Sequence, residues 1–241
     1  MNTKLPNLYL IILLAAFALF FLASCTTNIN AVIYRGGNAE LSMESALLPR
    51  TIGLIDSLRS FSGEDLDSPI LDAPSIALSL SLSSGVSSVS FQNISNSSLE
   101  GRISISDIGN FLSGDGADQR LIIYTEGNND SSIKVNLSIA NAPYIISMLS
   151  SDVEEYLLAL MAPCATGEIY TREEYIGLLS MVYGNALAAE IANAIIGIRL
   201  VLPGAIRSAI GGSYMGNEIV FNIPLVDIMV LEESLYYEIY W

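Results

Sequence analysis

A strict alternation of apolar and polar residues is the feature that most constrains this chain. A period of two buries one face of a β-strand and leaves the other face in solvent. Gly, Asn, Asp and Ser separate the alternating segments, so we expect strands joined into an antiparallel sheet. The alternating segments are residues 76–83, 88–91, 102–106 and 133–139, and a denser apolar run covers 121–124.

Further strands are expected on both sides of this region. Residues 29–34 precede a Gly36-Gly37-Asn38 turn that leads into Leu41 and Met43, which is typical of a β-hairpin. Towards the C-terminal end, four more strands are predicted at 195–202, 205–210, 218–223 and 235–241.

Helix signals fall between these strands. Pro49 stands where a helix would begin, and Gly63 marks its end. A short helix is expected from Asn141-Ala142-Pro143. Two S/T-x-x-E patterns, Ser151 with Glu154 and Thr171 with Glu174, match the capping box. The second precedes an apolar stripe of Tyr175, Leu178, Leu179 and Val182, which ends at Gly184 before a helix at 186–194.

Strands, then helices, then strands indicate the α+β class. We expect a large antiparallel sheet, open or curled, with helices packed on one face. No fixed repeat and no linker composition divides the chain, so a single domain is predicted.

The first 24 residues have the organisation of an export signal. Lys4 is their only charge, and the fifteen residues from Leu8 to Leu22 are uncharged. That length suits a signal peptide, whereas a membrane span needs about 20 residues. Leu22-Ala23-Ser24-Cys25 resembles the lipobox of bacterial lipoproteins, which implies cleavage before Cys25 and diacylation of its thiol. We therefore expect a signal peptide at 1–24 and a lipid-anchored α+β domain at 25–241; the alternative is an uncleaved signal anchor.

The charge balance limits the partners. Loss of Lys4 would take the net charge from −15 to −16 and leave Lys134 as the single lysine. Such a surface repels phosphate backbones, so no nucleic-acid partner is expected. Anionic headgroups are repelled as well, so acyl chains on Cys25 must supply the membrane attachment. The expected location is the cell envelope, on a membrane facing the periplasm or the cell surface.

The chain lacks the residues of several common catalytic sites. There is no histidine, which excludes Ser-His-Asp and Cys-His catalysis and imidazole zinc sites. We predict no cofactor, no metal, no catalytic residue and no enzymatic activity.

The remaining reactive residues have structural explanations. Cys164 has no second cysteine to pair with if Cys25 is acylated, and is expected to be a small buried residue. Ser131 and Lys134 have S-x-x-K spacing, but on a strand they would face opposite sides. Paired carboxylates, such as Glu173-Glu174 and Glu232-Glu233, suit solvated helix positions.

One stretch carries a further resemblance. It comprises Leu202-Pro203-Gly204, Gly211-Gly212, Gly216-Asn217, residues 221–225 and residues 237–241. These segments resemble the end of uncharacterised spirochaete-type lipoproteins and, more loosely, the LppM group of bacterial lipoproteins. The latter resemblance implies a sheet-walled apolar cavity and a role in binding lipids.

Two functions remain open at this point. The first is a non-catalytic binding domain for a lipid or another apolar ligand; the second is a structural lipoprotein that contacts an envelope or host protein of unknown identity. Only a few residues separate Cys25 from the first expected strand. We therefore expect the domain to lie directly on the bilayer, with its first hairpin turned towards the headgroups.

Overall fold

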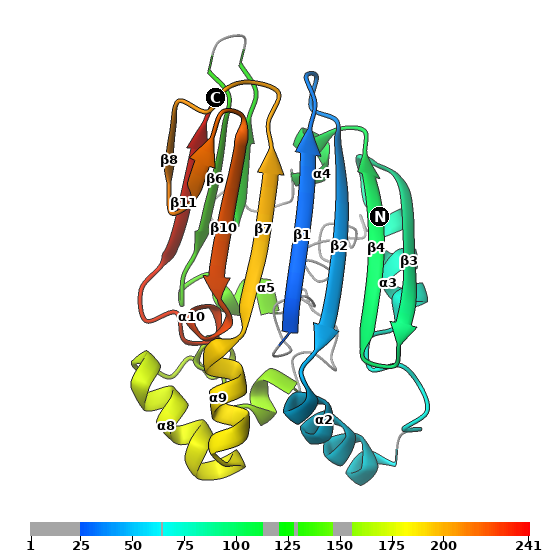
Figure 1. Cartoon of the computed structure of the whole chain (residues 1–241), viewed down its shortest axis with the longest axis vertical. Coiled ribbons are helices and arrows are strands. Elements are labelled where there is room, and N and C mark those ends of the chain that lie inside the picture. The colour runs from blue at the N-terminus through cyan, green and yellow to red at the C-terminus, as the bar shows by residue number, and fades with distance from the viewer. Residues whose placement is uncertain (1–24, 64, 113–120, 128–129, 147–155) are drawn as a thin grey trace, which may run out of the picture.

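The computed structural model describes residues 25–63, 65–112, 121–127, 130–146 and 156–241. Within these ranges it confirms the α+β class, with a large sheet, a small sheet and helices between their strands (Figure 1). The large sheet has seven strands in the order β3-β4-β2-β1-β7-β10-β9. They are β1 (Cys25–Ile33), β2 (Ala39–Leu47), β3 (Val86–Ser95), β4 (Ser98–Ile105), β7 (Ile195–Val201), β9 (Ser213–Met215) and β10 (Glu218–Pro224).

The small sheet has four antiparallel strands in the order β5-β6-β11-β8. They are β5 (Ile122–Thr125), β6 (Ser132–Leu137), β8 (Ser208–Ile210) and β11 (Leu235–Tyr240). The chain passes from the small sheet to the large one between β8 and β9, through Gly211 and Gly212. Gly211 has a φ of +86° and lies against Tyr237, so a side chain here would be strained and crowded.

One pairing departs from the expected antiparallel arrangement. β1 and β7 lie side by side in parallel, with Thr27 opposite Ile196 and Val32 opposite Val201. Parallel neighbours need a long crossover connection, and here more than 160 residues separate the two strands. Alternation favours strands, but it carries no information about which distant strands pair.

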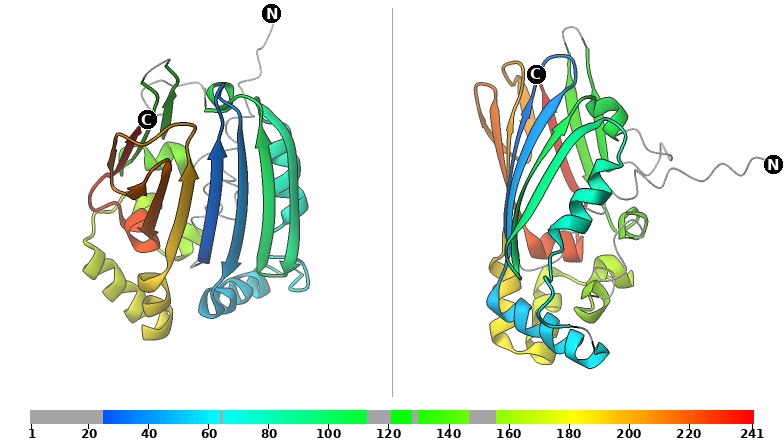
Figure 2. Two further views of the ribbon diagram at one scale, coloured as in Figure 1. Left: turned by 45° about the horizontal axis from the view of Figure 1, so that its top comes forward. Right: turned by 90° about the vertical axis from the view of Figure 1, so that its right-hand side faces the viewer.

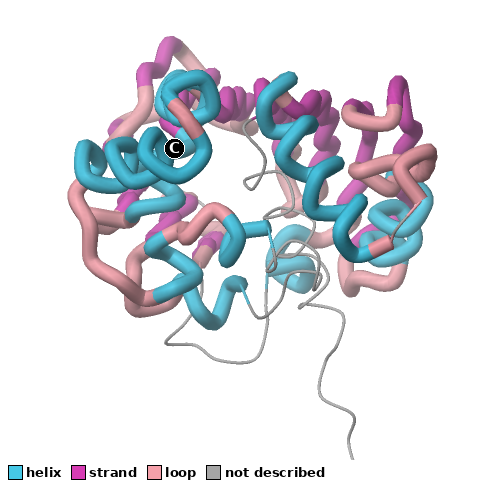
Figure 3. The backbone as a smooth tube through the Cα atoms, turned by 90° about the horizontal axis from the view of Figure 1, so that it is seen from below, coloured by secondary structure: helices cyan, strands magenta, loops and turns pink. Residues whose placement is uncertain are grey.

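The helices lie over one face of the large sheet and at one of its ends. In the right-hand view of Figure 2, α3 and α4 lie on one face of the large sheet. In Figure 1, α2, α8 and α9 lie at the lower end of the sheet. Figure 3, seen from that lower end, shows the helices in front of the strands. The helices are α2 (Pro49–Ser62), α3 (Ala73–Ser81), α4 (Ile108–Leu112), α5 (Ala142–Ile146), α7 (Pro163–Thr166), α8 (Arg172–Tyr183), α9 (Asn185–Asn193) and α10 (Leu225–Val230).

The strand expected at residues 76–83 is wrong, because this segment is helix α3. The Asp72 side chain accepts a hydrogen bond from the Ser75 backbone N–H, and Pro74 lies in the first helical turn. Ile76 and Leu80 are buried at helical spacing, while Leu78 is 64% exposed. Residues four apart fit both the period of a strand and that of a helix, whereas the cap at Asp72 is specific to a helix.

The other expected elements are confirmed with small changes in their bounds. The hairpin turn at Gly36-Gly37, the end of α2 at Gly63 and the capping box at Thr171 are all present. β8 is shorter than expected and begins at Ser208. The capping pattern at Ser151 and Glu154 lies outside the described residues.

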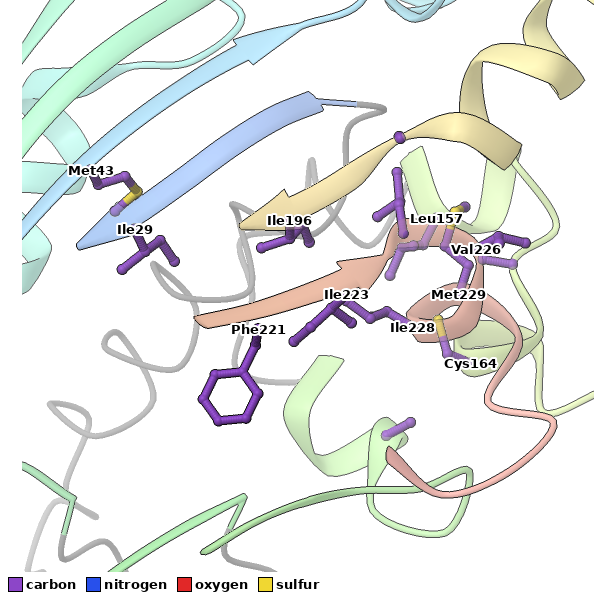
Figure 4. Packing of buried hydrophobic residues seen from close by; sticks show 14 of the residues in the cluster. Ile29, Met43, Leu157, Cys164, Ile196, Phe221, Ile223, Val226, Ile228 and Met229 are labelled. Atoms are coloured by element: carbon purple, nitrogen blue, oxygen red, sulfur yellow. The ribbon is translucent and has the colours of Figure 1, made fainter. Parts of the chain in front are cut away.

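Helix α10 was not expected from the sequence. It follows Pro224 directly, and five of its six side chains are buried. It contacts α7, α8 and α9, and it therefore joins the large sheet to the helices at the lower end. Figure 4 shows Val226, Ile228 and Met229 from this helix in the same apolar region as Leu157 and Cys164.

Candidate functional site at the anchor end of the sheet

Cys25, the expected acyl acceptor, is the first residue of β1. Its backbone lies opposite Leu47, the last residue of β2. We call this end of the large sheet the anchor end, and the opposite end the far end. The anchor end is the lower end in Figure 1, where the arrow of β1 begins. No spacer therefore separates Cys25 from the folded sheet.

The first hairpin lies at the far end. Eight residue steps from Cys25 to Ile33 span about 26 Å along a strand. The turn at Gly36 follows, and its backbone N–H donates to Glu126 at 3.0 Å, beside β5. The hairpin that was expected to face the headgroups thus lies at the end of the large sheet opposite to Cys25, because β1 runs away from Cys25 rather than folding back on it.

The inner face of the large sheet is apolar over its whole length. Odd-numbered residues of β1, β2, β4 and β10 and even-numbered residues of β7 share this face. Figure 4 shows Ile29, Met43, Ile196, Phe221 and Ile223 pointing to the same side of the strands. The polar exceptions on these five strands are Thr27 and Ser45 near the anchor end, whose buried hydroxyls lie 3.0 Å apart in a hydrogen bond.

The Glu190 carboxylate links helices α2 and α9 by hydrogen bonds at the anchor end. α2 starts after β2, and α9 ends just before β7, so both helices leave the sheet beside Cys25. Leu48 cannot cap α2 with its side chain. Glu190 of α9 does so instead: it accepts from the backbone N–H groups of Arg50 and Thr51, at 3.0 and 2.9 Å, and from the Thr51 hydroxyl at 3.1 Å. A negative charge at a helix N-terminus is favourable, so this contact is a tertiary cap.

The first turn of α8 joins this helix to α9 and α10, and we call α2, α7, α8, α9 and α10 at the anchor end the helix group. The Thr171 hydroxyl accepts from the Glu174 backbone N–H at 3.2 Å, and the Glu174 carboxylate accepts from the Thr171 backbone N–H at 2.8 Å. The carboxylate also accepts from the Thr171 hydroxyl at 3.0 Å, and the two hydrogen bonds that it accepts, from the backbone N–H first and the hydroxyl second, lower the pKa of Glu174. Arg172 donates to Asp227 of α10 at 3.1 Å and to the Ala192 carbonyl of α9 at 3.3 Å.

The corner between α8 and α9 is uncharged, and about half of its residues are exposed. No residue from 175 to 189 carries a charge. Tyr175 and Leu179 are buried as the apolar stripe predicted, but Val182 is 52% exposed and Met181 is 84% exposed. Val182 was expected in the core; the last turn of α8 instead leaves it in solvent. We call residues 177–189 the α8–α9 corner.

Cys164 is buried, as expected. Its side chain is 5% exposed, and burial raises the pKa of its thiol to about 12. A thiol in that environment is a poor nucleophile at neutral pH. Nearby, the Tyr175 hydroxyl donates to the Leu160 carbonyl at 3.0 Å. These residues stabilise the helix group rather than forming a reactive centre.

The S-x-x-K residues take part in separate contacts. The Ser131 hydroxyl donates to the Gly127 carbonyl at 3.3 Å, while Lys134 pairs with Glu238 at 2.6 Å. Glu238 also accepts from the hydroxyls of Tyr236 and Tyr240, and these donors with Lys134 lower its pKa to about 2. Lys134 is thus held in an ion pair on the outer face of the small sheet.

One carboxylate of each remaining pair, Glu174 or Glu232, has a structural contact. Glu173 and Glu174 lie in the first turn of α8, as expected, and Glu232 accepts from the Arg172 backbone N–H at 2.9 Å. Among the residues that the structure describes, no group of three metal-ligating side chains could hold a metal ion. Over the same ranges, no helix is long and apolar enough to cross a membrane.

The comparisons with known proteins give one distant similarity. No protein-family model matches the chain, and no curated protein matches it. The structure is similar to the folded domain of the LppM protein of Mycobacterium tuberculosis, solved by NMR. The TM-score is 0.40 and the identity 9%, over 90% of this chain and 89% of that chain. Similarity at this level does not establish a family.

Sequence reasoning missed two parts of the anchor end. Glu190 lies in a helical pattern that gives no sign of a partner 139 residues away. The Thr27–Ser45 pair requires the β1–β2 register, which follows from the Gly36-Gly37 turn once the hairpin is accepted. The turn was therefore a usable signal for Thr27 and Ser45, whereas nothing local indicated Glu190.

Proposed function

We propose that this chain is a lipid-anchored protein of the cell envelope, which binds a lipid or another apolar ligand without catalysing a reaction. The observation that carries the proposal is the position of β1. This strand begins at the expected acyl acceptor, Cys25, and its inner side chains, such as Ile29 and Ile33, belong to the apolar face of the large sheet. An apolar face that starts at the membrane anchor suits a ligand taken from that membrane.

The anchor itself has a direct test. Cys25→Ser removes the thiol that would accept the acyl chains, so metabolic labelling with a palmitate analogue should give no signal from this variant. The wild-type chain, expressed at the same level, should be labelled. Label that persists on Cys25→Ser would overturn the lipid anchor.

Ligand binding is tested on the inner face with a neighbouring control. Ala31 and Val32 are successive residues of β1 and face opposite sides of the sheet. Ala31→Phe should remove apolar molecules that mass spectrometry detects in the purified Cys25→Ser protein, while Val32→Phe should retain them. If the inner face is filled by protein alone, no such molecule will be found. Ala31→Phe will then cost about 1–3 kcal/mol of stability through overpacking.

A second candidate, a protein-interaction function, is favoured by the outer face of the small sheet. Around the Lys134–Glu238 ion pair lie Tyr236, Ile210 and Ile123, exposed by 41%, 51% and 43%. Exposed tyrosines and apolar side chains around a fixed charge pair are typical of protein interfaces. Tyr236→Ala and Ile210→Ser should abolish a protein contact but leave apolar ligands bound, which separates the two functions.

A further inference from the structure

The α8–α9 corner combines exposure, neutrality and nearness to the anchor. Met181 and Val182 are 84% and 52% exposed, and no charged residue occurs between Glu174 and Glu190. This stretch lies in a chain with a net charge of −15 before any cleavage. Two side-chain hydrogen bonds stabilise the corner: the Ser180 hydroxyl donates to the Asn185 side chain, and the Tyr183 hydroxyl donates to the Ala159 carbonyl.

We propose that the α8–α9 corner is the surface that contacts the bilayer holding Cys25, an inference that rests on the proposed lipid anchor. Ile196 of β7 is level with Thr27 of β1, so α9 leaves the sheet at the level of Cys25. The nine residues of α9 place the corner at most about 14 Å beyond that level. Apolar side chains of membrane-surface helices enter the interface by about 5–10 Å. With the lipid of Cys25 in the leaflet, a tilted α9 brings the corner to this depth.

Charge selects this corner over the other protruding part of the anchor end. α2 also extends beyond the strands (Figure 1), and Phe61 near its end is 90% exposed. However, the chain continues from there to Asp65 and Asp67, both exposed, which anionic headgroups repel. The uncharged corner meets no such repulsion. The domain should therefore tilt towards α8 and α9, with the acidic loop after α2 held away from the leaflet.

Two methionines allow a matched test. Met181 in the corner is 84% exposed, and Met215 is 86% exposed on β9. Met215 lies at the far end, since it is opposite Glu218, which in turn is opposite Val201. M181C and M215C would each be labelled with an environment-sensitive dye in the acylated full-length protein. Cys164 is buried and Cys25 acylated, so the introduced thiol is the one that reacts.

The labelled proteins are reconstituted into vesicles of phosphatidylethanolamine and phosphatidylglycerol that contain a shallow spin-labelled quencher lipid. We expect the dye at position 181 to emit at shorter wavelength and to be quenched several-fold more than the dye at 215. Equal quenching at both positions would overturn the inference, and so would stronger quenching at 215.

A charge variant serves as the control for a dye that inserts into the membrane independently of the protein surface. With the dye on A186C, M181E and V182E together should reduce the quenching several-fold, and M215E should leave it unchanged. Quenching that resists the two glutamates contradicts the inference, whereas a sharp fall supports it. A protein that is not acylated does not enter the vesicles at all. That result rejects the anchor instead, and coupling Cys25 to a maleimide lipid then allows the same comparison.

Discussion

Removing the Glu190 carboxylate should loosen α2 from α9. Its Oε1 atom accepts from the backbone N–H groups of Arg50 and Thr51 and from the Thr51 hydroxyl. Thr51 is 2% exposed, so water cannot easily replace the lost partner. Glu190→Ala leaves these donors unpaired at the first turn of a fourteen-residue helix.

The expected loss follows from two contributions. A lost N-cap costs about 0.5–2 kcal/mol, and a buried unpaired donor about 1–3 kcal/mol. The two overlap, so we expect Glu190→Ala to lower the free energy of unfolding by about 2–3 kcal/mol. Glu190→Gln keeps one acceptor oxygen and loses the charge that favours the helix N-terminus. It should lose about 0.3–1 kcal/mol.

Urea denaturation followed by circular dichroism measures these differences, with Glu233→Gln, an exposed carboxylate, as the control. Hydrogen exchange supplies a local readout, since the amides of Arg50 and Thr51 should exchange faster in Glu190→Ala. Equal losses for Ala and Gln would refute the reasoning, because the acceptor oxygen would then contribute nothing. A loss below about 0.5 kcal/mol for Glu190→Ala would also refute it.

Three further predictions concern other parts of the chain. Thr171→Ala should lower the free energy of unfolding by about 0.5–2 kcal/mol through loss of the capping box, and an unchanged denaturation midpoint would contradict this. Glu238 has a pKa of about 2 against an ordinary 4.5. Its ionised carboxylate therefore stabilises the fold above pH 4.5, and this stabilisation is lost as the pH falls towards 2. Glu238→Gln should flatten the pH dependence of the free energy of unfolding between these two pH values. Gly101 lies directly opposite Phe91, whose ring occupies the place of a Cβ. Gly101→Ala should cost about 1–3 kcal/mol by overpacking, and a Phe91→Leu background should reduce that cost.

Local signals predicted much of the secondary structure, because its causes are local. The β3–β4 hairpin follows from alternation around a turn, and the start of α8 follows from the capping box at Thr171. The strand expected at residues 76–83 was wrong because Ile76 and Leu80, four residues apart, fit the period of a helix as well as that of a strand. At such positions the residues that flank the segment, here Asp72 and Pro74, carry more information than its period.

The arrangement at the anchor end could not be predicted in the same way. The parallel contact of β1 with β7 and the cap of α2 by Glu190 join residues more than 130 positions apart. Exposure of Val182 depends on where α8 ends relative to its neighbours, which the helical period does not specify. Cys25 was singled out by its local motif, but its position at the level where α9 leaves the sheet required the strand pairing.

The pairing of β1 determines where a flexible spacer can be inserted to move the domain away from the bilayer. β1 is central: it pairs with β2 from Cys25 onwards and with β7 from Thr27 onwards. A spacer inserted after Thr27 would interrupt this strand, so the spacer must be inserted between Cys25 and Thr26.

A flexible spacer of about 20 residues has a root-mean-square length of roughly 25 Å, enough to lift the α8–α9 corner off the leaflet. If the protein exchanges an apolar ligand with the membrane beneath it, the spacer should impair complementation of a deletion strain, while an inserted pair of residues should not. Full complementation by the long spacer would favour the protein-interaction function, because a partner on the outer face of the small sheet can still be reached from a longer tether.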